Sequence, residues 1–104
     1  MTTDRHRLAP AERELTRYFD RNGYVRRQRL ERLKKEGTQR YKKGEEVRLV
    51  AESETELLTI RRLLREAGFT PGRPFVKSRQ FRQPIYGRDV VARFLAMVRA
   101  AHDA

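Results

Sequence analysis

The strongest runs of apolar residues at regular helical spacing lie in two segments of the chain, and any core must be built largely from them. One segment runs from Leu57 to Ala67. The other places Val91, Phe94 and Val98 on one side of a helix. Hydrophobic residues make up 38% of the chain, below the roughly 45–50% of an average globular domain. The core therefore has to come from a few concentrated segments.

Both segments have the sequence signals of helix ends. Residues 53–56 (SETE) have the spacing of a capping box, in which a serine and a glutamate satisfy orphan backbone amides. Gly68 ends the helix that follows. The second segment begins at Arg88, directly after Gly87, and is predicted to be helical to about Ala101.

Two stretches of the chain predict hairpins. Every second residue from Val47 to Ala51 is apolar, as in a strand with one buried face, and residues 38–42 are its expected partner. Residues 75–86 (FVKSRQFRQPIY) are expected to form two short strands folded on each other. Pro84 can lie there only at an edge or a strand start, because it has no backbone N–H.

The first third of the chain is predicted to be helical. Residues 1–9 are polar, and we expect them to form a flexible tail. Pro10 begins a helix that runs to about Asp20, and the Asn-Gly pair that follows ends it. A second helix is expected from Val25 to Glu36, where the next residue is a glycine, and cations cover most of its circumference.

These elements predict an α+β fold, in which a small antiparallel sheet of two hairpins is covered by helices on one face. We expect one domain over residues 10–104, since most domains have roughly 100–150 residues. Residues 10–37 would form a basic helical segment that starts with an N-terminal helical appendage. Residues 38–104 would form the sheet and its two packing helices.

The composition excludes several kinds of site. The chain has no cysteine, which rules out disulfides and thiolate metal sites. Its two histidines, His6 and His102, lie near opposite ends, so we expect no metal site and no cofactor. No segment approaches the ~20 apolar residues of a membrane span, and the start of the chain has no apolar signal-peptide run. We therefore expect a soluble, cytoplasmic protein without a membrane partner.

Charge is the feature that indicates a partner. Twenty-five Lys and Arg residues face fourteen Asp and Glu residues, a formal net charge of +11. Residues 21–43 have a net charge of +8 and residues 69–88 have +5 without a single acid, so the remaining residues sum to −2. Such an excess is typical of proteins that bind a polyanion. We expect a nucleic acid, DNA or RNA, and find no feature that indicates the oligomeric state.

The two basic stretches supply the candidate binding residues. The first, as a helix, could lie in a major groove or along a phosphate backbone, or could remain a solvated surface helix. Strand alternation in the second places four side chains on one face: Phe75, Lys77, Arg79 and Phe81. There the rings could stack bases while the cations hold phosphates, or the aromatic residues and Ile85 could belong to the core. The candidates are Arg26, Arg27, Arg29, Arg32, Lys34, Lys35, Arg40, Lys42, Lys43, Arg73, Lys77, Arg79, Arg82 and Arg88.

The acids of the chain are poor candidates for catalysis, and we expect no catalytic residue. Glu52, Glu54 and Glu56 surround a helix start, where capping and the helix dipole account for them. Glu36, directly before Gly37 at the end of a predicted helix, is the one acid in a suggestive place.

The order helix, hairpin, helix, two strands, helix over residues 25–101 resembles a half-domain of the LAGLIDADG homing endonucleases. In that family a helix ends in an acid followed by glycine, and a saddle-shaped sheet lies on DNA. Residues 33–37 (LKKEG) would form that helix end, although the helix is dense with cations where the family has an apolar dimer helix. The resemblance implies a metal-binding role for Glu36 and a DNA-facing sheet carrying Arg40, Lys42, Arg48, Lys77, Arg79 and Arg82.

Three functions agree with these features. The first is a non-catalytic nucleic-acid-binding protein that contacts the phosphate backbone through a basic helix and a basic hairpin. The second is a protein–protein interaction subunit with an acidic partner. The third is a metal-dependent DNA endonuclease related to the homing endonucleases, with Glu36 as a metal ligand.

Overall fold

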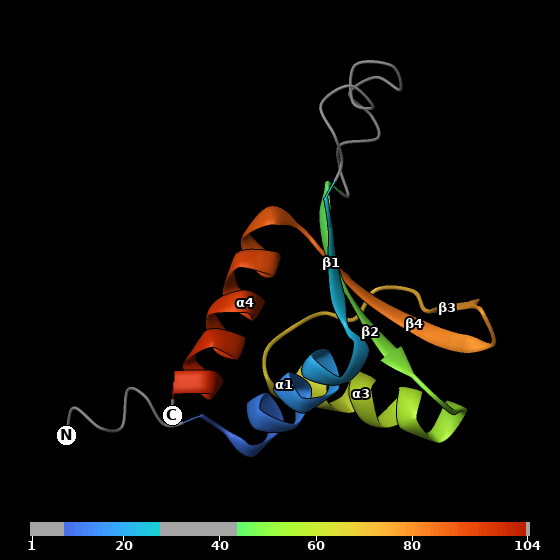
Figure 1. Ribbon diagram of the computed structural model, residues 1–104, viewed down its shortest axis with the longest axis horizontal. Coiled ribbons are helices and arrows are strands. Elements are labelled where there is room, and N and C mark those ends of the chain that lie inside the picture. The colour runs from blue at the N-terminus through green and yellow to red at the C-terminus, as the bar shows by residue number, and fades with distance from the viewer. Residues whose placement is uncertain (1–7, 28–43, 104) are drawn as a thin grey trace.

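The structure, a computed structural model, describes residues 8–27 and 44–103 of the chain (Figure 1). In chain order its elements are α1 (Pro10–Asn22), β1 (Tyr24–Arg27), β2 (Glu45–Ala51), α3 (Glu54–Glu66), β3 (Phe75–Lys77), β4 (Gln80–Tyr86) and α4 (Arg88–Asp103). Helices and an antiparallel sheet are thus combined in the described residues, and the predicted α+β fold is confirmed.

The strands form one antiparallel sheet in the order β1-β2-β4-β3. β2 and β4 lie at its centre and pair with each other from Glu46 to Ala51. β1 and β3 are the edge strands of the described sheet. The sheet is therefore built from two hairpins that join along β2 and β4.

The β3–β4 hairpin agrees with the prediction. Its turn consists of Ser78 and Arg79, whose φ angles of 53° and 64° are both positive. Two-residue turns with positive φ at both positions match the right-handed twist of the flanking strands. Lys77 and Gln80 are directly paired on either side of this turn, so it reverses the chain without a bulge.

The first hairpin differs from the prediction. Residues Tyr24–Arg27 form strand β1, so the helix predicted to start at Val25 is wrong there. Aromatic and β-branched side chains such as those of Tyr24 and Val25 favour strands, and Gly23 has already ended the preceding helix. β2 pairs with β1 on one side and with β4 on the other, and its predicted partner, residues 38–42, lies outside the described residues.

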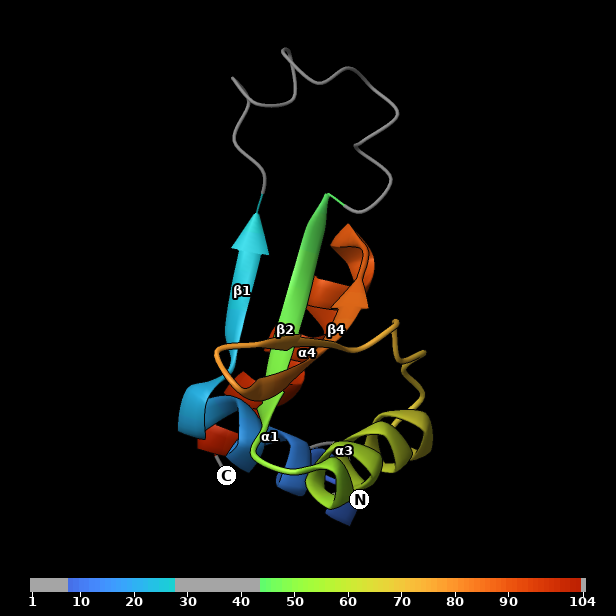
Figure 2. The ribbon, with the colours of Figure 1, turned by 90° about the vertical axis from the view of Figure 1, so that its right-hand side faces the viewer.

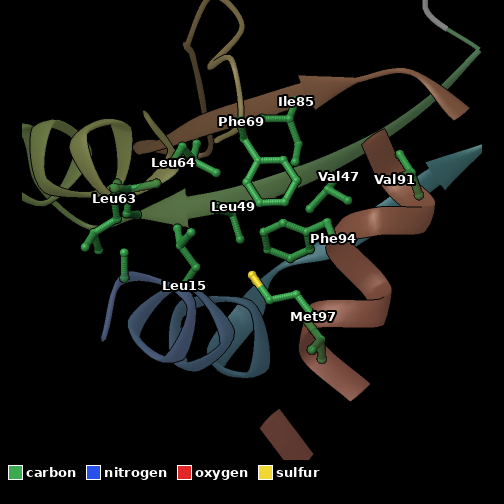
Figure 3. Packing of buried hydrophobic residues seen from close by; sticks show 14 of the residues in the cluster. Leu15, Val47, Leu49, Leu63, Leu64, Phe69, Ile85, Val91, Phe94 and Met97 are labelled. Carbon is green, nitrogen blue, oxygen red and sulfur yellow. The ribbon is translucent and has the colours of Figure 1, made fainter. Parts of the chain in front are cut away.

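All three described helices cover the same face of the sheet. Figure 2 shows α4 behind the strands, with α1 and α3 at the lower end of the sheet. Val47, Leu49 and Ala51 of β2 point toward the helices and are fully buried, which confirms the predicted alternation. Figure 3 shows how side chains from the helices and strands close the core between them, and the buried cluster includes Leu15, Val47, Leu49, Ile60, Leu64, Ile85, Val91 and Phe94.

The N-terminal helix α1 belongs to this core and is not an appendage. Leu15 is fully buried, and the ring of Phe19 packs edge-on against Phe94 of α4 with 5.6 Å between ring centroids. Asp20 lies 2.7 Å from the His102 ring near the end of α4. Leu8, from the predicted tail, is partly buried and packs against the same core. α1 is therefore packed into the domain and contacts α4, the last helix of the chain.

The predicted ends of α3 and α4 are close to those observed. At the start of α3 the Ser53 hydroxyl accepts a hydrogen bond from the Glu56 amide (3.1 Å), as expected for a capping box. The Glu56 carboxylate accepts from the amide of Glu52 (2.9 Å). α4 begins at Arg88 as predicted. Among the described helices, none has the length and apolar content needed to cross a membrane.

The linker between α3 and β3 is fastened to β4. The backbone amide of Gly72 donates to the Pro84 carbonyl (2.8 Å). The side-chain amide of the buried Gln83 donates to the Gly72 carbonyl (2.8 Å). Arg61 of α3 donates to the same Gly72 carbonyl (2.9 Å). Helix, linker and strand are thereby held together, which fixes the direction in which the β3–β4 hairpin leaves the domain.

Candidate nucleic-acid interface

The described helices leave the second face of the sheet uncovered. Every other residue of each strand points to this side, because side chains alternate along a strand. We call this surface the outer face. It consists of Tyr24, Arg26, Glu46, Arg48, Val50, Phe75, Lys77, Gln80, Arg82, Pro84 and Tyr86.

Cations outnumber acids on the outer face. Arg26, Arg48, Lys77 and Arg82 face a single acid within it, Glu46. At its edge Glu52, just beyond β2, accepts a hydrogen bond from the side-chain amide of Gln80 (3.0 Å). The face is thus positively charged, and it is not an apolar surface of the kind that packs against another sheet.

The single acid within the outer face is engaged in ion pairs. Glu46 accepts from Arg48 Nε at 2.8 Å, and the side chains of both residues are only about one-tenth exposed. Arg26 Nη1 lies 3.8 Å from the other Glu46 oxygen. Because Glu46 lies next to both Arg48 and Arg26, the cations of the outer face without a carboxylate partner among the described residues are Lys77 and Arg82.

Aromatic side chains lie between these cations. The Arg48 guanidinium lies over the ring of Phe75, 4.8 Å from its centroid, a distance at which a cation is attracted by the ring. The Tyr24 hydroxyl accepts from Arg48 Nη1 at 3.4 Å. The outer face thus has the mixture of rings and cations that nucleic-acid-binding sheets use.

The pKa values of two tyrosines on the outer face are shifted in opposite directions. Burial raises the pKa of Tyr24, but hydrogen bonds from Arg48 and Arg82 outweigh burial and lower its pKa below the ordinary value. Burial also raises the pKa of Tyr86, and the charge of Glu46 raises it further. The arginines next to Tyr24 thus favour its phenolate form, whereas burial and Glu46 disfavour the phenolate form of Tyr86.

The turn of the β3–β4 hairpin extends this positive surface. Lys77 and Arg79 are exposed, and neither makes an ion pair within the part of the chain that the structure describes. Arg73, in the linker before β3, is exposed as well. Residues 69–88 contain no acid, so these cations have no neighbouring carboxylate along the chain.

The structure brings together some of the predicted binding residues and separates others. Arg26, Lys77 and Arg82 share the outer face, with Arg79 at the adjoining turn. Arg27 points to the opposite side of β1, where its Nε lies 3.4 Å from Glu45, and Arg88 begins α4. The remaining candidates lie outside the described residues: Arg29, Arg32, Lys34, Lys35, Arg40, Lys42 and Lys43, together with Glu36.

The alternation predicted for the second basic stretch fails at the turn. Phe75 and Lys77 lie on the outer face, whereas Phe81 points to the helices and packs against the core. The reason is that Ser78 and Arg79 form a reversal rather than part of a strand. The core interpretation is thus confirmed for Phe81 and for the buried Ile85, and it is wrong for Phe75.

Tyr24 and Arg48 of the outer face were absent from the candidates. Tyr24 lies one residue before the helix predicted from Val25 and had no predicted role, and Arg48 entered only through the resemblance to homing endonucleases. The signal for Arg48 was available, since it alternates with the buried residues of its own strand. Arg21, from the same basic stretch as Arg26, has a structural role instead, because it donates to the Val50 carbonyl (2.8 Å) and to Glu56 (3.2 Å).

The described residues hold no candidate metal centre, since nowhere among them do three His, Cys, Asp or Glu side chains come together. The helix before the first hairpin is α1, which ends at Asn22 before Gly23. The acid for which the resemblance implies a metal-binding role is Glu36, which lies outside the described residues.

Comparisons with protein-family models, with curated proteins and with solved structures found no match. The resemblance to homing endonuclease half-domains stays a prediction from the order of elements.

Proposed function

We propose that this protein binds a nucleic acid through the outer face of its sheet and the β3–β4 turn. The observation that supports the proposal best is a set of cations on one surface, Lys77, Arg79 and Arg82, which have no carboxylate partner among the described residues. The phosphate backbone of a nucleic acid supplies the acids that the described chain does not place there. We place this activity in the cytoplasm and propose no catalytic step.

Engaged acids support a binding role rather than a catalytic one. Glu46 is paired with Arg48, and Glu45 lies next to Arg27. Glu56 caps α3 and binds Arg21. Each of these carboxylates has a structural partner, so none is held ready to bind a metal or to transfer a proton.

The first test is the dependence of binding on salt. Each neutralised phosphate of duplex DNA contributes about 0.9 to the slope of log affinity against log salt concentration. Four contacts, one for each of Arg73, Lys77, Arg79 and Arg82, would give a slope near −3.6 and roughly a hundredfold loss between about 50 and 200 mM salt. Fluorescence anisotropy with duplex DNA, single-stranded DNA and a structured RNA measures this slope.

The second test compares two double variants of equal charge. Lys77→Gln with Arg79→Gln removes two exposed cations from the proposed surface. Arg62→Gln with Arg65→Gln removes two exposed cations from α3, in the helix layer. We expect the first pair to lower the salt slope by about 1.8 and the second pair to leave it near the parent value.

Two results would reject the proposed function. One is the absence of salt-dependent binding to any of the three nucleic acids. The other is an equal loss of affinity in both double variants, which would assign binding to net charge alone. If the protein binds an acidic protein in a pull-down assay and binds none of the three nucleic acids, the protein-interaction alternative would be favoured.

A further inference from the structure

Three side chains from three strands meet near the middle of the outer face, and we call them the Tyr24 cluster: Tyr24, Arg48 and Arg82. Tyr24 is directly opposite Arg48 across β1 and β2. Arg82 lies on β4 opposite Val50, one step along the same face. Val50 is buried although it points to the outer face, as expected when the long side chains close over it.

The Tyr24 cluster has more positive charge than its surroundings neutralise. Arg48 pairs with Glu46 through its Nε (2.8 Å) and Nη2 (3.4 Å). Arg82 has no carboxylate partner among the described residues, and its Nη1 donates to the neutral side-chain oxygen of Gln80 (3.1 Å). One guanidinium of the cluster is therefore left without an anion.

The cluster also has a hydrogen-bond donor that is not used. The Nε of Arg82 is buried and has no acceptor within the described part of the chain. The Tyr24 oxygen accepts from Arg48, and a hydroxyl that accepts a hydrogen bond can also donate one. Buried polar groups are nearly always hydrogen-bonded, so an unused donor of this kind indicates a missing acceptor.

We propose that the Tyr24 cluster binds one phosphate group of a nucleic acid. The guanidinium fork of Arg82 and the hydroxyl of Tyr24 offer donors from two directions, and a phosphate has several oxygens to accept them. The environment of Tyr24 agrees, since the neighbouring arginines lower its pKa despite burial. This inference rests on the proposed function and goes beyond it by naming the site that holds the phosphate.

The adjoining ring gives this site a second contact. Phe75 is directly opposite Arg82 across β3 and β4, and neighbouring strands lie about 4.8 Å apart. A nucleotide whose phosphate contacts Arg82 can therefore bring its base or sugar toward Phe75. The ring of Phe75 on β3 also contacts the guanidinium of Arg48 on β2.

The test uses the full-length protein with ¹³C at the tyrosine Cζ atoms, and Tyr24→Phe identifies the Tyr24 signal. Inorganic phosphate is the first probe, and duplex and single-stranded oligonucleotides with and without a 5′-phosphate are the second. We expect phosphate to shift the Tyr24 signal in a saturable way and to raise the Tyr24 pKa, because a nearby negative charge opposes phenolate formation. The oligonucleotides should produce the same changes.

A matched pair of substitutions locates the effect. Arg82→Gln should abolish the response to phosphate and lower oligonucleotide affinity about tenfold or more, the value expected for one charged hydrogen-bonding group. Arg62→Gln, which removes one exposed cation from α3, should change affinity less than about twofold. Should Arg82→Gln fail to fold, Tyr24→Phe keeps the ring and should still lower affinity about fivefold.

The possible outcomes separate this inference from the proposed function. Oligonucleotide binding with a silent Tyr24 signal, and with Arg82→Gln equal to Arg62→Gln, would overturn the phosphate site and leave the proposed function intact. No salt-dependent binding to duplex DNA, to single-stranded DNA or to the structured RNA would overturn the proposed function itself. Stronger response to the 5′-phosphorylated oligonucleotides would assign the site to a terminal phosphate, and equal response would assign it to the backbone. A larger response to polyglutamate than to either oligonucleotide would contradict a phosphate site.

Discussion

Replacing Leu15 by alanine tests whether α1 is part of the domain. Leu15 lies on α1 with its side chain fully buried, between the sheet and the other helices. Removing a buried leucine side chain costs about 2.7–5.0 kcal/mol, depending on how far the surroundings collapse into the cavity. Whole domains are stable by only about 5–15 kcal/mol, so the loss would be a large fraction of the total.

Thermal and urea unfolding followed by circular dichroism measure this loss. For a chain of this length each kcal/mol corresponds to about 4 °C in Tm, so we expect Leu15→Ala to lower Tm by roughly 11–20 °C. Leu58→Ala is the matched control, because Leu58 lies on α3 with 61% of its surface exposed. That control should change the free energy of unfolding by no more than about 0.5 kcal/mol. Equal effects of the two substitutions would mean that α1 is an appendage and that its packing contributes nothing.

Two further predictions concern the end of α1. Gly23→Ala places a Cβ atom 2.9 Å from the backbone Cα of Phe19, so the helix end must shift, and we expect a loss of about 1–3 kcal/mol in urea unfolding; a variant as stable as the parent would contradict this. Arg21→Gln removes the hydrogen bond that holds the pKa of Glu56 below its ordinary value of 4.5, against the opposing effect of burial. A carboxyl whose pKa is lowered by folding stabilises the fold at pH values above its ordinary pKa, and this contribution is lost as the pH falls through the pKa of the folded state. The Tm difference between parent and variant should therefore shrink from about pH 7 to pH 3. A difference that stays constant over this range would refute the assignment.

The helices could be predicted because their signals are local. Ser53, the leucines that follow it and Gly68 define α3 within one short stretch, and the structure confirms the helix there. The same holds for α4, which needs only the spacing of its own apolar residues. Such elements depend little on the rest of the chain, since capping and amphipathic spacing act within a few turns.

Strand β1 could not be predicted in the same way, because its partner is distant in the sequence. Arg26 is paired with Glu46, twenty residues further along. Within its own neighbourhood Arg26 stands three residues before another arginine, and this spacing favoured a helix. The backbone pairing of β1 with β2 also brings Arg26 and Arg27 next to Glu46 and Glu45, and this contact cannot be read from the neighbourhood of Arg26 in the sequence.

Some residues of the outer face were predicted from the sequence and others were not. The charge of residues 69–88 identified Lys77 and Arg82, which do share a face. Phe81 was placed on the same face as Lys77 because alternation was carried through the turn, where it does not apply. Tyr24 was missed since its role depends on β1. A two-residue reversal at Ser78 and Arg79 changes the face of every later residue.

Alternation along β2 has a consequence for how the sheet finds its pairing. A shift of one residue between neighbouring strands exchanges the two faces of a strand. For β2 that shift would place Arg48 and Glu46 beneath the helices and would expose Val47 and Leu49 to water. Burying a charged side chain among apolar ones is far more costly than leaving it near solvent. Arg48, which we propose as part of the phosphate site, therefore also helps to select the correct strand register together with Glu46, and replacing both by apolar residues would permit misaligned sheets.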